Sequence, residues 1–275
     1  MGATPKHLFM VIQPSGASPQ YFSYRSLVAM PGYDFRSPRL YVEAPLGEGV
    51  HVPLDGAQTH YLGTVLRHKS GGRVLVFNGR DGEWSATLVL HKRGGALDVG
   101  TRTRRQIPAA DLHYLFAPLK AARLDYMAQK AVEMGVSRLQ PVLTRHTQVA
   151  RVNTQRMRAN AIEAAEQCGV LSLPDIDAPV TLAQALAERH RGRLLVFCDE
   201  DSEAVNPAAA LKSGLSRSPL AVLIGPEGGF AEDERASLLK LPNVVRLSLG
   251  PRILRADTAA VAALTLVQTF LGDWR

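Results

Sequence analysis

From residue 111 to its end, the chain alternates apolar strand-like runs with helical segments. Each apolar run precedes one expected helix. DLHYLFAPL precedes a helix near 120–134, RLQPVLT one near 154–168, RLLVFC one near 207–213, LAVLIG one near 231–240, and VVRLSLG one near 257–271. Strands that alternate with helices form a mainly parallel sheet, and the helices cover both of its faces. We therefore predict an α/β domain over residues 107–275.

The preceding part of the chain has a different pattern, with short apolar runs between turn residues over residues 39–105. Asn78-Gly79 and Asp81-Gly82 separate two such runs, and glycine accepts the positive φ that hairpin turns require. One helical stretch, AQTHYLGTVLRHK, interrupts the strands. We predict a small β-barrel over residues 38–106, with a polar linker from Arg102 to Gln106 ahead of Pro108.

Residues 1–37 show no lasting hydrophobic period and contain a single acid, Asp34. Such a segment is typical of a disordered extension. It is compatible with a weak targeting peptide or with a functional chain that starts at Met30, and we favour the second interpretation.

The formal net charge of +7 is unevenly distributed, with 13 Lys and Arg against 7 Asp and Glu in residues 1–110. A local basic excess is either a solvated surface or the footprint of a partner with a phosphate backbone. Cys168 and Cys198 are far apart, and the histidines show no metal-ligand spacing. No apolar run reaches the about 18 residues that a membrane span requires. We expect a reduced, cytoplasmic protein without a structural metal.

Two predicted strands of the α/β part end in similar corners, Gly225-Pro226 within IGPEGG and Gly250-Pro251 within LGPR. In an open α/β sheet, ligands bind beyond the carboxyl ends of the strands. Glycine lets the backbone approach a ligand, and proline fixes the turn, although each corner alone is more typical of an ordinary strand-to-helix turn. Neither a dinucleotide fingerprint nor a P-loop occurs. Together the corners predict a pocket whose irregular loops hold a nucleotide-like ligand through backbone groups.

The helix expected near 120–134 carries Lys120, Arg123 and Lys130 within about 80° of one another, beside its apolar stripe. Such a row of cations is either a solvated surface or, beside a pocket, a site for phosphate groups.

Several motifs carry a resemblance to a known family. LIGPEGGF and LSLGPRILRADTAAVAAL, with KAVEMGVSRLQPVLT and EAAEQCG upstream, resemble the RsmE family of bacterial 16S ribosomal RNA uridine-N3 methyltransferases, in the SPOUT superfamily. The similarity extends over residues 38–273 and includes RLYV and VLRHKSGGRVLVFNGRDGEW, which are similar to the family's PUA-like barrel. The two glycine-proline motifs in tandem are the most specific part of the resemblance.

This resemblance implies a trefoil knot in the α/β domain and a homodimer whose active sites include the subunit interface. It implies S-adenosylmethionine as the cofactor and 16S ribosomal RNA of the small subunit as the partner. The loops after three strands would hold the cofactor, through Phe197, Cys198, Asp199, Glu200, Ile224, Gly225, Pro226, Glu227, Gly228, Gly229, Leu247, Leu249, Gly250, Ile253 and Leu254.

Methyl transfer from a sulfonium needs no metal, but uracil N3 must lose a proton, and the resulting negative charge must be stabilised. Arginine stays protonated, so Arg255 is the candidate for stabilising the anionic base; the alternative is a salt bridge to Asp257 or to a partner chain. Asp257 is either a cap of the following helix or the proton acceptor. Glu163 and Glu166 either reach the cleft or face water.

Two positions depart from the family pattern. Val170 follows EAAEQCG where arginine is common, which weakens any claim that this loop binds RNA phosphate. Asp257 stands where glutamate is usual, which suits a helix cap better than a long reach to the substrate.

The basic excess of the barrel is interpreted as a surface for RNA phosphates, which position RNA without specifying sequence. The candidates there are Arg67, His68, Lys69, Arg73, Arg80, Lys92, Arg93, Arg102, Arg104 and Arg105, joined by Lys120, Arg123, Lys130 and Arg252 in the α/β part. Two alternative functions remain open from sequence alone. They are a ribose 2′-O-methyltransferase of the same superfamily and a non-catalytic RNA-binding factor in ribosome assembly.

Overall fold

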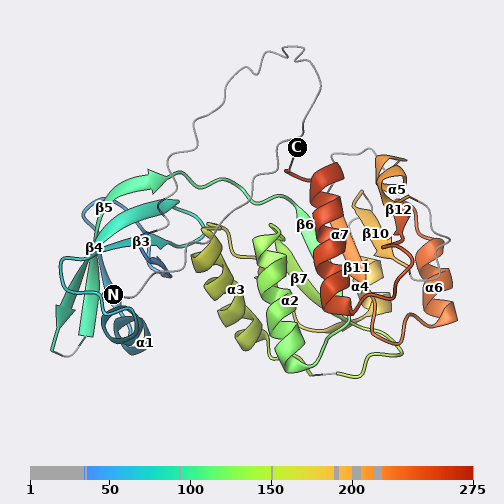
Figure 1. The fold of residues 1–275 in the computed structure, drawn as a ribbon, viewed down its shortest axis with the longest axis horizontal. Coiled ribbons are helices and arrows are strands. Elements are labelled where there is room, and N and C mark those ends of the chain that lie inside the picture. Colours follow the sequence, from blue (N-terminus) through green and yellow to red (C-terminus); the bar gives the residue numbers. More distant parts are fainter. Residues whose placement is uncertain are drawn as a thin grey trace, which may run out of the picture. The chain divides into compact units, whose positions relative to one another are not determined.

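The structure is a computed structural model that describes residues 34, 36–92, 94–149, 151–188, 192–199, 206–213 and 219–274. The predictions for residues 1–33, including the start at Met30, lie outside the described residues. The described residues contain a seven-stranded sheet B and a five-stranded sheet A (Figure 1).

Sheet B is wholly parallel, as the alternating pattern predicts. Its strands, in spatial order, are β12 (Val244–Leu247), β10 (Leu194–Cys198), β11 (Leu220–Ile224), β6 (Leu112–Phe116), β7 (Arg138–Leu143) and β8 (Asp175–Ile176), with β9 (Val180–Thr181) also on β7. The helices between the strands are α2 (Ala121–Glu133), α3 (Thr154–Cys168), α4 (Leu182–Glu188), α5 (Pro207–Ser213) and α6 (Glu232–Leu239), and α7 (Ala256–Phe270) follows the last strand. The five helices predicted from sequence are confirmed to within a residue or so at each end, whereas β8, β9 and α4 were not predicted.

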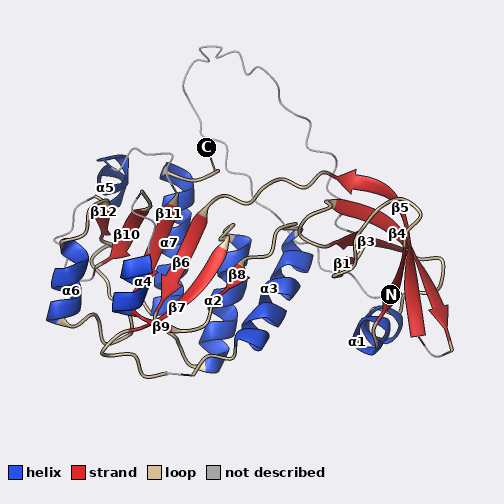
Figure 2. Ribbon diagram, turned by 180° about the vertical axis from the view of Figure 1, so that it is seen from behind, coloured by secondary structure: helices blue, strands red, loops and turns tan. Residues whose placement is uncertain are grey.

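Alternate residues of the central strands enter two different cores, because successive side chains of a strand point to opposite faces. Tyr114 and Val222 pack on one face with α2, α5 and α7. Leu115 and Leu223 pack on the other face with α4 and α6. Figure 2 shows these helices in front of and behind the sheet. The sheet therefore has apolar layers on both sides, which leaves its strand ends as the place for polar chemistry.

Sheet A is a curled antiparallel sheet with one parallel pair. Its strands, in spatial order, are β1 (Arg39–Tyr41), β3 (Arg73–Phe77), β4 (Glu83–His91), β5 (Gly94–Arg104) and β2 (His51–Leu54). The predicted hairpin is confirmed, since β3 and β4 are antiparallel and Gly79 and Gly82 have φ of 84° and 86°. The predicted helical stretch is shorter than expected, with α1 (Gly56–His60) continuing as the π-helical turn η1 (Tyr61–Val65).

The polar segment expected to begin a linker at Arg102 is part of strand β5 as far as Arg104. The Arg104 guanidinium binds the buried carboxylate of Glu83 at 2.6 Å, and Arg39 binds the same carboxylate at 2.9 Å. A charged residue can end a strand inside the fold when its charge is paired in this way. Arg104 therefore stabilises sheet A rather than presenting its charge to RNA phosphate as the sequence suggested.

Glu166 on α3 lies against sheet A and accepts a hydrogen bond from the backbone N–H of Tyr41 at 2.8 Å. The nearby Glu163 is exposed. Burial raises the pKa of Glu166 to about 7, with a further contribution from Glu163, although the Tyr41 bond opposes the shift. Glu166 thus neither faces water nor reaches the cleft, but joins α3 to β1.

This raised pKa predicts a pH-dependent stability. Below the unfolded pKa of about 4.3 both states hold the proton, and as the pH rises toward 7 only the folded state keeps it. Stability is therefore lost over this range. We expect Glu166→Gln, which stays neutral, to match the wild type at pH 4.5 and to be more stable at pH 8, in urea unfolding followed by circular dichroism. Equal stabilities at pH 8 would contradict the assignment.

Candidate active site

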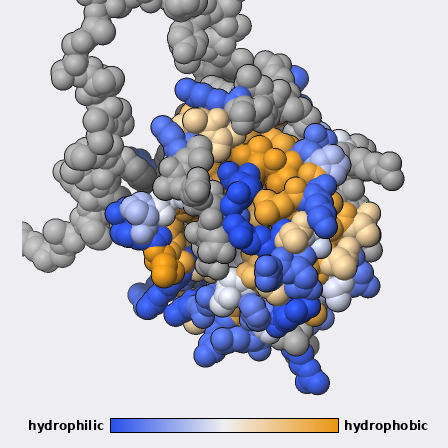
Figure 3. All heavy atoms as spheres, turned by 90° about the vertical axis from the view of Figure 1, so that its right-hand side faces the viewer, coloured by the Kyte–Doolittle hydropathy of each residue, from blue (hydrophilic) through white to orange (hydrophobic). Residues whose placement is uncertain are grey.

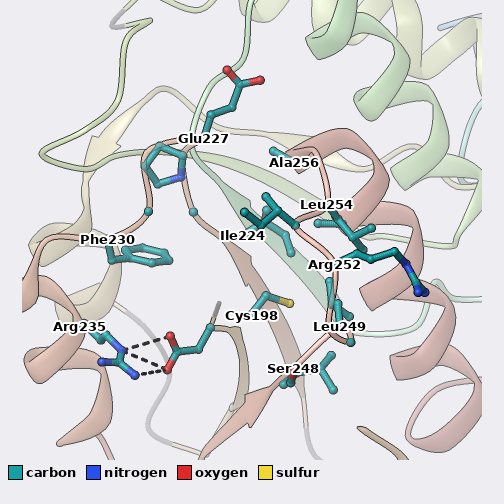
Figure 4. Close-up of a pocket in the computed structure, with 18 of the residues that line it drawn as sticks. Cys198, Ile224, Glu227, Phe230, Arg235, Ser248, Leu249, Arg252, Leu254 and Ala256 are labelled. Atoms are coloured by element: carbon teal, nitrogen blue, oxygen red, sulfur yellow. Dashed lines mark hydrogen bonds and ion pairs between the residues drawn. The ribbon is translucent and has the colours of Figure 1, made fainter. Parts of the chain in front are cut away.

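The carboxyl ends of β10, β11 and β12 meet at one edge of sheet B, because the three strands are parallel neighbours. The loops that follow them surround a cavity of about 300 Å³ (Figure 4). The predicted cofactor residues that line this cavity, called the donor pocket below, are Cys198, Asp199, Ile224, Gly225, Pro226, Glu227, Gly229, Leu247, Leu249, Gly250, Ile253 and Leu254. Both glycine-proline corners therefore contribute to one site.

Two of the predicted cofactor residues that the structure describes, Phe197 and Gly228, do not line the donor pocket. Phe197 is fully buried beneath it, with its ring edge-on to Phe230 at 5.1 Å. Gly228 lies beside His146, whose Nδ1–H donates to the carbonyl oxygens of Gly228 and Gly229 at 3.2 and 3.1 Å. Glu200 is outside the described residues.

The loop after β11 is tight because of Gly225. A Cβ added at this residue would lie 2.5 Å from the Phe230 ring. The loop also closes on itself through a hydrogen bond from the Gly229 N–H to the Pro226 carbonyl at 3.0 Å. The glycine at this corner is therefore required by an aromatic neighbour within the protein, and this contact brings Phe230 into the wall of the pocket.

The loop after β12 forms the opposite wall and is more open. Gly250 has φ of 98°, a conformation that favours glycine. A Cβ at Gly250 would contact nothing within 4 Å. Ile253 is 98% exposed at the rim although its side chain is apolar. Arg252, predicted to bind RNA, also lines the pocket, and Figure 4 shows its guanidinium pointing away from Cys198.

An ion-pair cluster supports the base of the donor pocket. The buried carboxylate of Asp199 accepts from Arg235 on α6 at 3.1 Å and from Arg246 on β12 at 2.9 Å. A buried carboxylate is stable when it is paired and hydrogen-bonded in this way. The two arginines therefore hold an acid at the edge of the pocket and join α6, β10 and β12.

The neighbouring Cys198 thiol is chemically quiet. Burial, assisted by the charge of Asp199, raises its pKa to about 12. The thiolate is the nucleophilic form of cysteine. Cys198 therefore lines the pocket as a neutral group at physiological pH.

The two predicted catalytic residues lie at the rim. Arg255 is exposed and occupies the N-cap position of α7, between Leu254 and Ala256, which both line the donor pocket. Within the described residues its guanidinium forms no hydrogen bond or ion pair, so the expected alternative of a bridge to Asp257 is absent there. Asp257 lies in the first turn of α7 and accepts from the Thr258 N–H at 2.9 Å. Its carboxylate thus binds a free first-turn N–H, although the N-cap position itself belongs to Arg255.

The row of cations on α2 divides between two environments. Lys130 binds Glu133 at 2.7 Å and lies away from the pockets. Lys120 and Arg123 line a second cavity of about 120 Å³, which shares Pro226 and Glu227 with the donor pocket. Arg123 also forms an ion pair with Glu227. This second cavity is called the side pocket below.

The cations predicted to bind RNA on sheet A are largely exposed. Arg67 and Lys69 are exposed in the loop after η1, and Arg67 has φ of 53°. Arg73 donates to Ser85 Oγ at 3.0 Å, and Arg80 donates to the Glu43 carbonyl at 2.7 Å. All four charges remain accessible to a polyanionic partner.

Several lining residues were not predicted. They are Phe230, Arg235, Ser248, Pro251, Ala256 and Ala259. Pro251 lay inside the quoted LGPR motif and could have been included from the sequence. Arg235 had no local signal, because its partner Asp199 is distant in the chain and the pairing exists only in the folded sheet.

The donor pocket fits a nucleoside-type sulfonium ligand. Ile224, Leu247 and Leu249 provide apolar walls suited to an aromatic base, and the loops around them present backbone groups that can fix its orientation. The cavity volume is at the lower end of the range of about 300–1,000 Å³ for small-molecule sites.

Known proteins with a similar sequence are RNA methyltransferases, as the site suggests. A family model described as an RNA methyltransferase domain matches residues 105–268, and one described as an RNA methyltransferase PUA domain matches residues 54–94. The ribosomal RNA small subunit methyltransferase E of Rickettsia conorii is 31% identical over 232 residues, which cover 84% of this chain and 94% of the relative.

Two solved structures contain the cofactor. The crystal structure of ribosomal RNA small subunit methyltransferase E from Neisseria gonorrhoeae, bound to S-adenosylmethionine, is 28% identical with a TM-score of 0.75 and covers 87% of this chain and 100% of that chain. A methyltransferase structure from Legionella pneumophila with the same cofactor is 27% identical with a TM-score of 0.74 and covers 85% of this chain and 98% of that chain.

The fold and the donor pocket define an S-adenosylmethionine-dependent RNA methyltransferase with a PUA domain. The chain belongs to the ribosomal RNA small subunit methyltransferase E family. The family resemblance and the α/β class inferred from sequence are thereby confirmed, whereas the trefoil knot stays a prediction.

Among the residues that the structure describes, no group of three or more His, Cys, Asp or Glu side chains is arranged to hold a metal ion. None of the described helices is long and apolar enough to cross a membrane.

Proposed function

We propose that this protein transfers a methyl group from S-adenosylmethionine to N3 of a specific uridine in the 16S ribosomal RNA of the small subunit. The observation that carries the proposal is the junction of both glycine-proline loops in one pocket at the ends of three neighbouring strands. The family to which the chain belongs, and the cofactor in its relatives, support the same reaction.

In this proposal the cofactor supplies an activated methyl group, and the protein supplies alignment and charge. Holding two reactants in line lowers a barrier by about 7–11 kcal/mol. Arg255 is the candidate for stabilising the negative charge that uracil acquires when N3 loses its proton. Its position at the rim, beside two lining residues, supports this role. Asp257 remains a candidate proton acceptor, although its bond to the Thr258 N–H supports the helix-stabilising role.

We further propose a division of labour along the chain. Residues 38–106 would form the PUA-like RNA-binding domain and residues 107–275 the methyltransferase domain, with residues 1–37 as an extension. The exposed Arg67, Lys69, Arg73 and Arg80 support binding of RNA phosphates by the first of these. The protein would act in the cytoplasm, where its RNA substrate is assembled.

A homodimer is also part of the proposal. Ile253 is almost fully exposed at the rim of the donor pocket, which suits an apolar contact with a second subunit. Figure 3, seen from the side of α5, α6 and β12, shows an apolar area bordered by hydrophilic residues. A partner seated near Ile253 would complete the wall of the pocket.

The proposed reaction is tested by mass spectrometry of 16S ribosomal RNA nucleosides from a strain that lacks this gene. We expect N3-methyluridine to disappear and to return when the gene is restored. Loss of a ribose 2′-O-methylated nucleoside instead would assign a different methylation, and no change in any nucleoside would favour a binding factor without catalysis.

The close contact between Gly225 and Phe230 predicts a sensitive position in the donor pocket. We expect Gly225→Ala to weaken S-adenosylmethionine binding by about tenfold or more and to lower the free energy of unfolding by about 1–3 kcal/mol, because the added methyl group must displace the Phe230 ring. Calorimetric titration and urea unfolding measure the two effects. Gly228→Ala is the control, because its Cβ would lie at an ordinary 3.4 Å from His146; similar affinities for both variants would contradict the prediction.

A further inference from the structure

The side pocket borders the donor pocket and has no role in the site described above. The two cavities share Pro226 and Glu227, so one corner of the loop after β11 separates them. Figure 4 shows the Glu227 side chain pointing away from Cys198 and Phe230, and Arg123 of α2 binds its carboxylate. A group bound in the side pocket would therefore be separated from the methyl donor in the donor pocket by this corner alone.

The size and walls of the side pocket suit one pyrimidine ring. Its volume of about 120 Å³ is close to that of an apolar cavity of about 150 Å³ that holds one benzene ring. Pro118, Leu119 and Val149 provide apolar surface for the faces of a ring. A flat heterocycle is thus a better occupant than an extended chain.

The polar residues of the pocket match the edge of uracil. That edge presents an acceptor, the N3–H donor and a second acceptor, so a complementary site needs a donor on each side of one acceptor. Lys120, Arg123 and Gln148 are donors, and the Glu227 carboxylate accepts hydrogen bonds only. Cytosine has no hydrogen on N3 and carries an amino donor in place of O4, so it leaves Glu227 opposite a lone pair.

The charge of the pocket favours a base over a phosphate group. The Glu227 carboxylate neutralises Arg123 by direct pairing, which leaves Lys120 as the excess cation. A phosphate placed here would meet a carboxylate, whereas the neutral edge of uracil would be bonded by it. This distinguishes the site from the phosphate-binding role expected for these cations from sequence.

We propose that the side pocket binds the target uracil, with Glu227 accepting from N3–H and Arg123 holding Glu227 in position. The proposal rests on the proposed uridine methylation. It gives the uridine selectivity that phosphate contacts on sheet A cannot supply. It also places N3 at the corner shared with the donor pocket.

The proposal is tested by NMR titration of the full-length protein with uridine 5′-monophosphate and cytidine 5′-monophosphate. We expect uridine 5′-monophosphate to shift the backbone signals of residues 119–123, 148–149 and 227, and to bind about tenfold or more tightly than the cytidine nucleotide, as one discriminating base contact gives. Shifts confined to other residues, equal affinities, or no shift at saturating nucleotide would overturn it.

Variants separate recognition from a general loss of structure. Glu227→Gln can donate as well as accept, so we expect the preference for uridine over cytidine to fall to within about twofold. Glu232→Gln, an exposed acid on α6 that lines neither cavity, should keep the wild-type preference. A full preference in Glu227→Gln would remove Glu227 from the role.

The nucleoside analysis distinguishes failure of the uracil-binding role from failure of the proposed methylation. If N3-methyluridine disappears in the deletion strain but the side pocket shows no preference for uridine, this inference fails and the proposed function stands. If the nucleoside is unaffected, the proposed function fails whatever the nucleotides bind.

Discussion

Replacing Arg255 by alanine should lower the rate of methyl transfer by about 10²–10³-fold, the usual effect of removing one preorganised group that stabilises charge in the transition state. The affinity for S-adenosylmethionine should stay within a few-fold of the wild type, because Arg255 is exposed and does not line the donor pocket. Single-turnover transfer of a labelled methyl group to small subunits from the deletion strain measures the rate, and calorimetry measures the affinity.

Two further variants test whether the effect is specific to the Arg255 guanidinium. Arg255→Lys keeps a positive charge but loses the planar fork of donors, so its rate should lie between those of the wild type and alanine variants. Arg156→Ala is the control for the loss of an exposed arginine, since Arg156 binds Asp125 at the surface and lines neither pocket. Near-normal turnover in Arg255→Ala, or a large loss of cofactor affinity, would remove Arg255 from the proposed role.

Replacing Glu83 by alanine should lower the free energy of unfolding by about 3–5 kcal/mol, the cost of leaving a buried charge without its partner. The Arg39 side chain is only 5% exposed and the Arg104 side chain 18% exposed, so water cannot readily replace the lost carboxylate. Thr103 Oγ1 also loses an acceptor at 2.8 Å. Urea unfolding followed by circular dichroism measures the change.

The same carboxyl contributes to acid sensitivity. Burial would raise the pKa of Glu83, but hydrogen bonds from Arg104, Thr103 and Arg39 outweigh it and lower the pKa. Its contribution to stability is therefore present above the unfolded pKa of about 4.3 and is lost as the pH falls below that value. The Glu83→Ala variant should therefore not show the loss of stability at low pH that protonation of Glu83 causes in the wild type.

A matched surface pair provides the control for Glu83. His51 and Asp98 also join two strands of sheet A, at 2.7 Å, but both side chains are 59% exposed. Asp98→Ala should cost at most about 1 kcal/mol, because a solvent-exposed polar pair contributes little to stability. Equal losses in the two variants would show that burial does not set the strength of the Glu83 cluster.

The loops of the donor pocket were predicted from sequence motifs. The corners at Gly225 and Gly250 were assigned to one site from their positions after strands, and the structure places them there. Their adjacency depends on β10 lying between β11 and β12, a strand order that differs from the chain order. Local pattern carries no information about that order, and the family resemblance implied only that the loops after three strands hold one cofactor.

The partners of several charged residues could not be predicted from the sequence. Arg104 was interpreted as a cation for RNA, Glu166 as a residue facing water or the cleft, and Arg235 was not considered. In the structure each has a partner far along the chain, namely Glu83, Tyr41 and Asp199. Charged groups are seldom buried without a partner. A charged residue is therefore predicted to lie at the surface when its partner cannot be identified from the sequence.

The sequence by itself determined most of the helices and strands, the division between a strand-rich first part and an alternating second part, and the residues that begin the loops of the site. These features follow from hydrophobic period and turn chemistry, which act between residues a few positions apart. The tertiary structure alone decided the order of the strands, which charges are paired, and that a second cavity adjoins the donor pocket. Those outcomes depend on burial and on contacts between distant segments, and such contacts exist only once the sheet has formed.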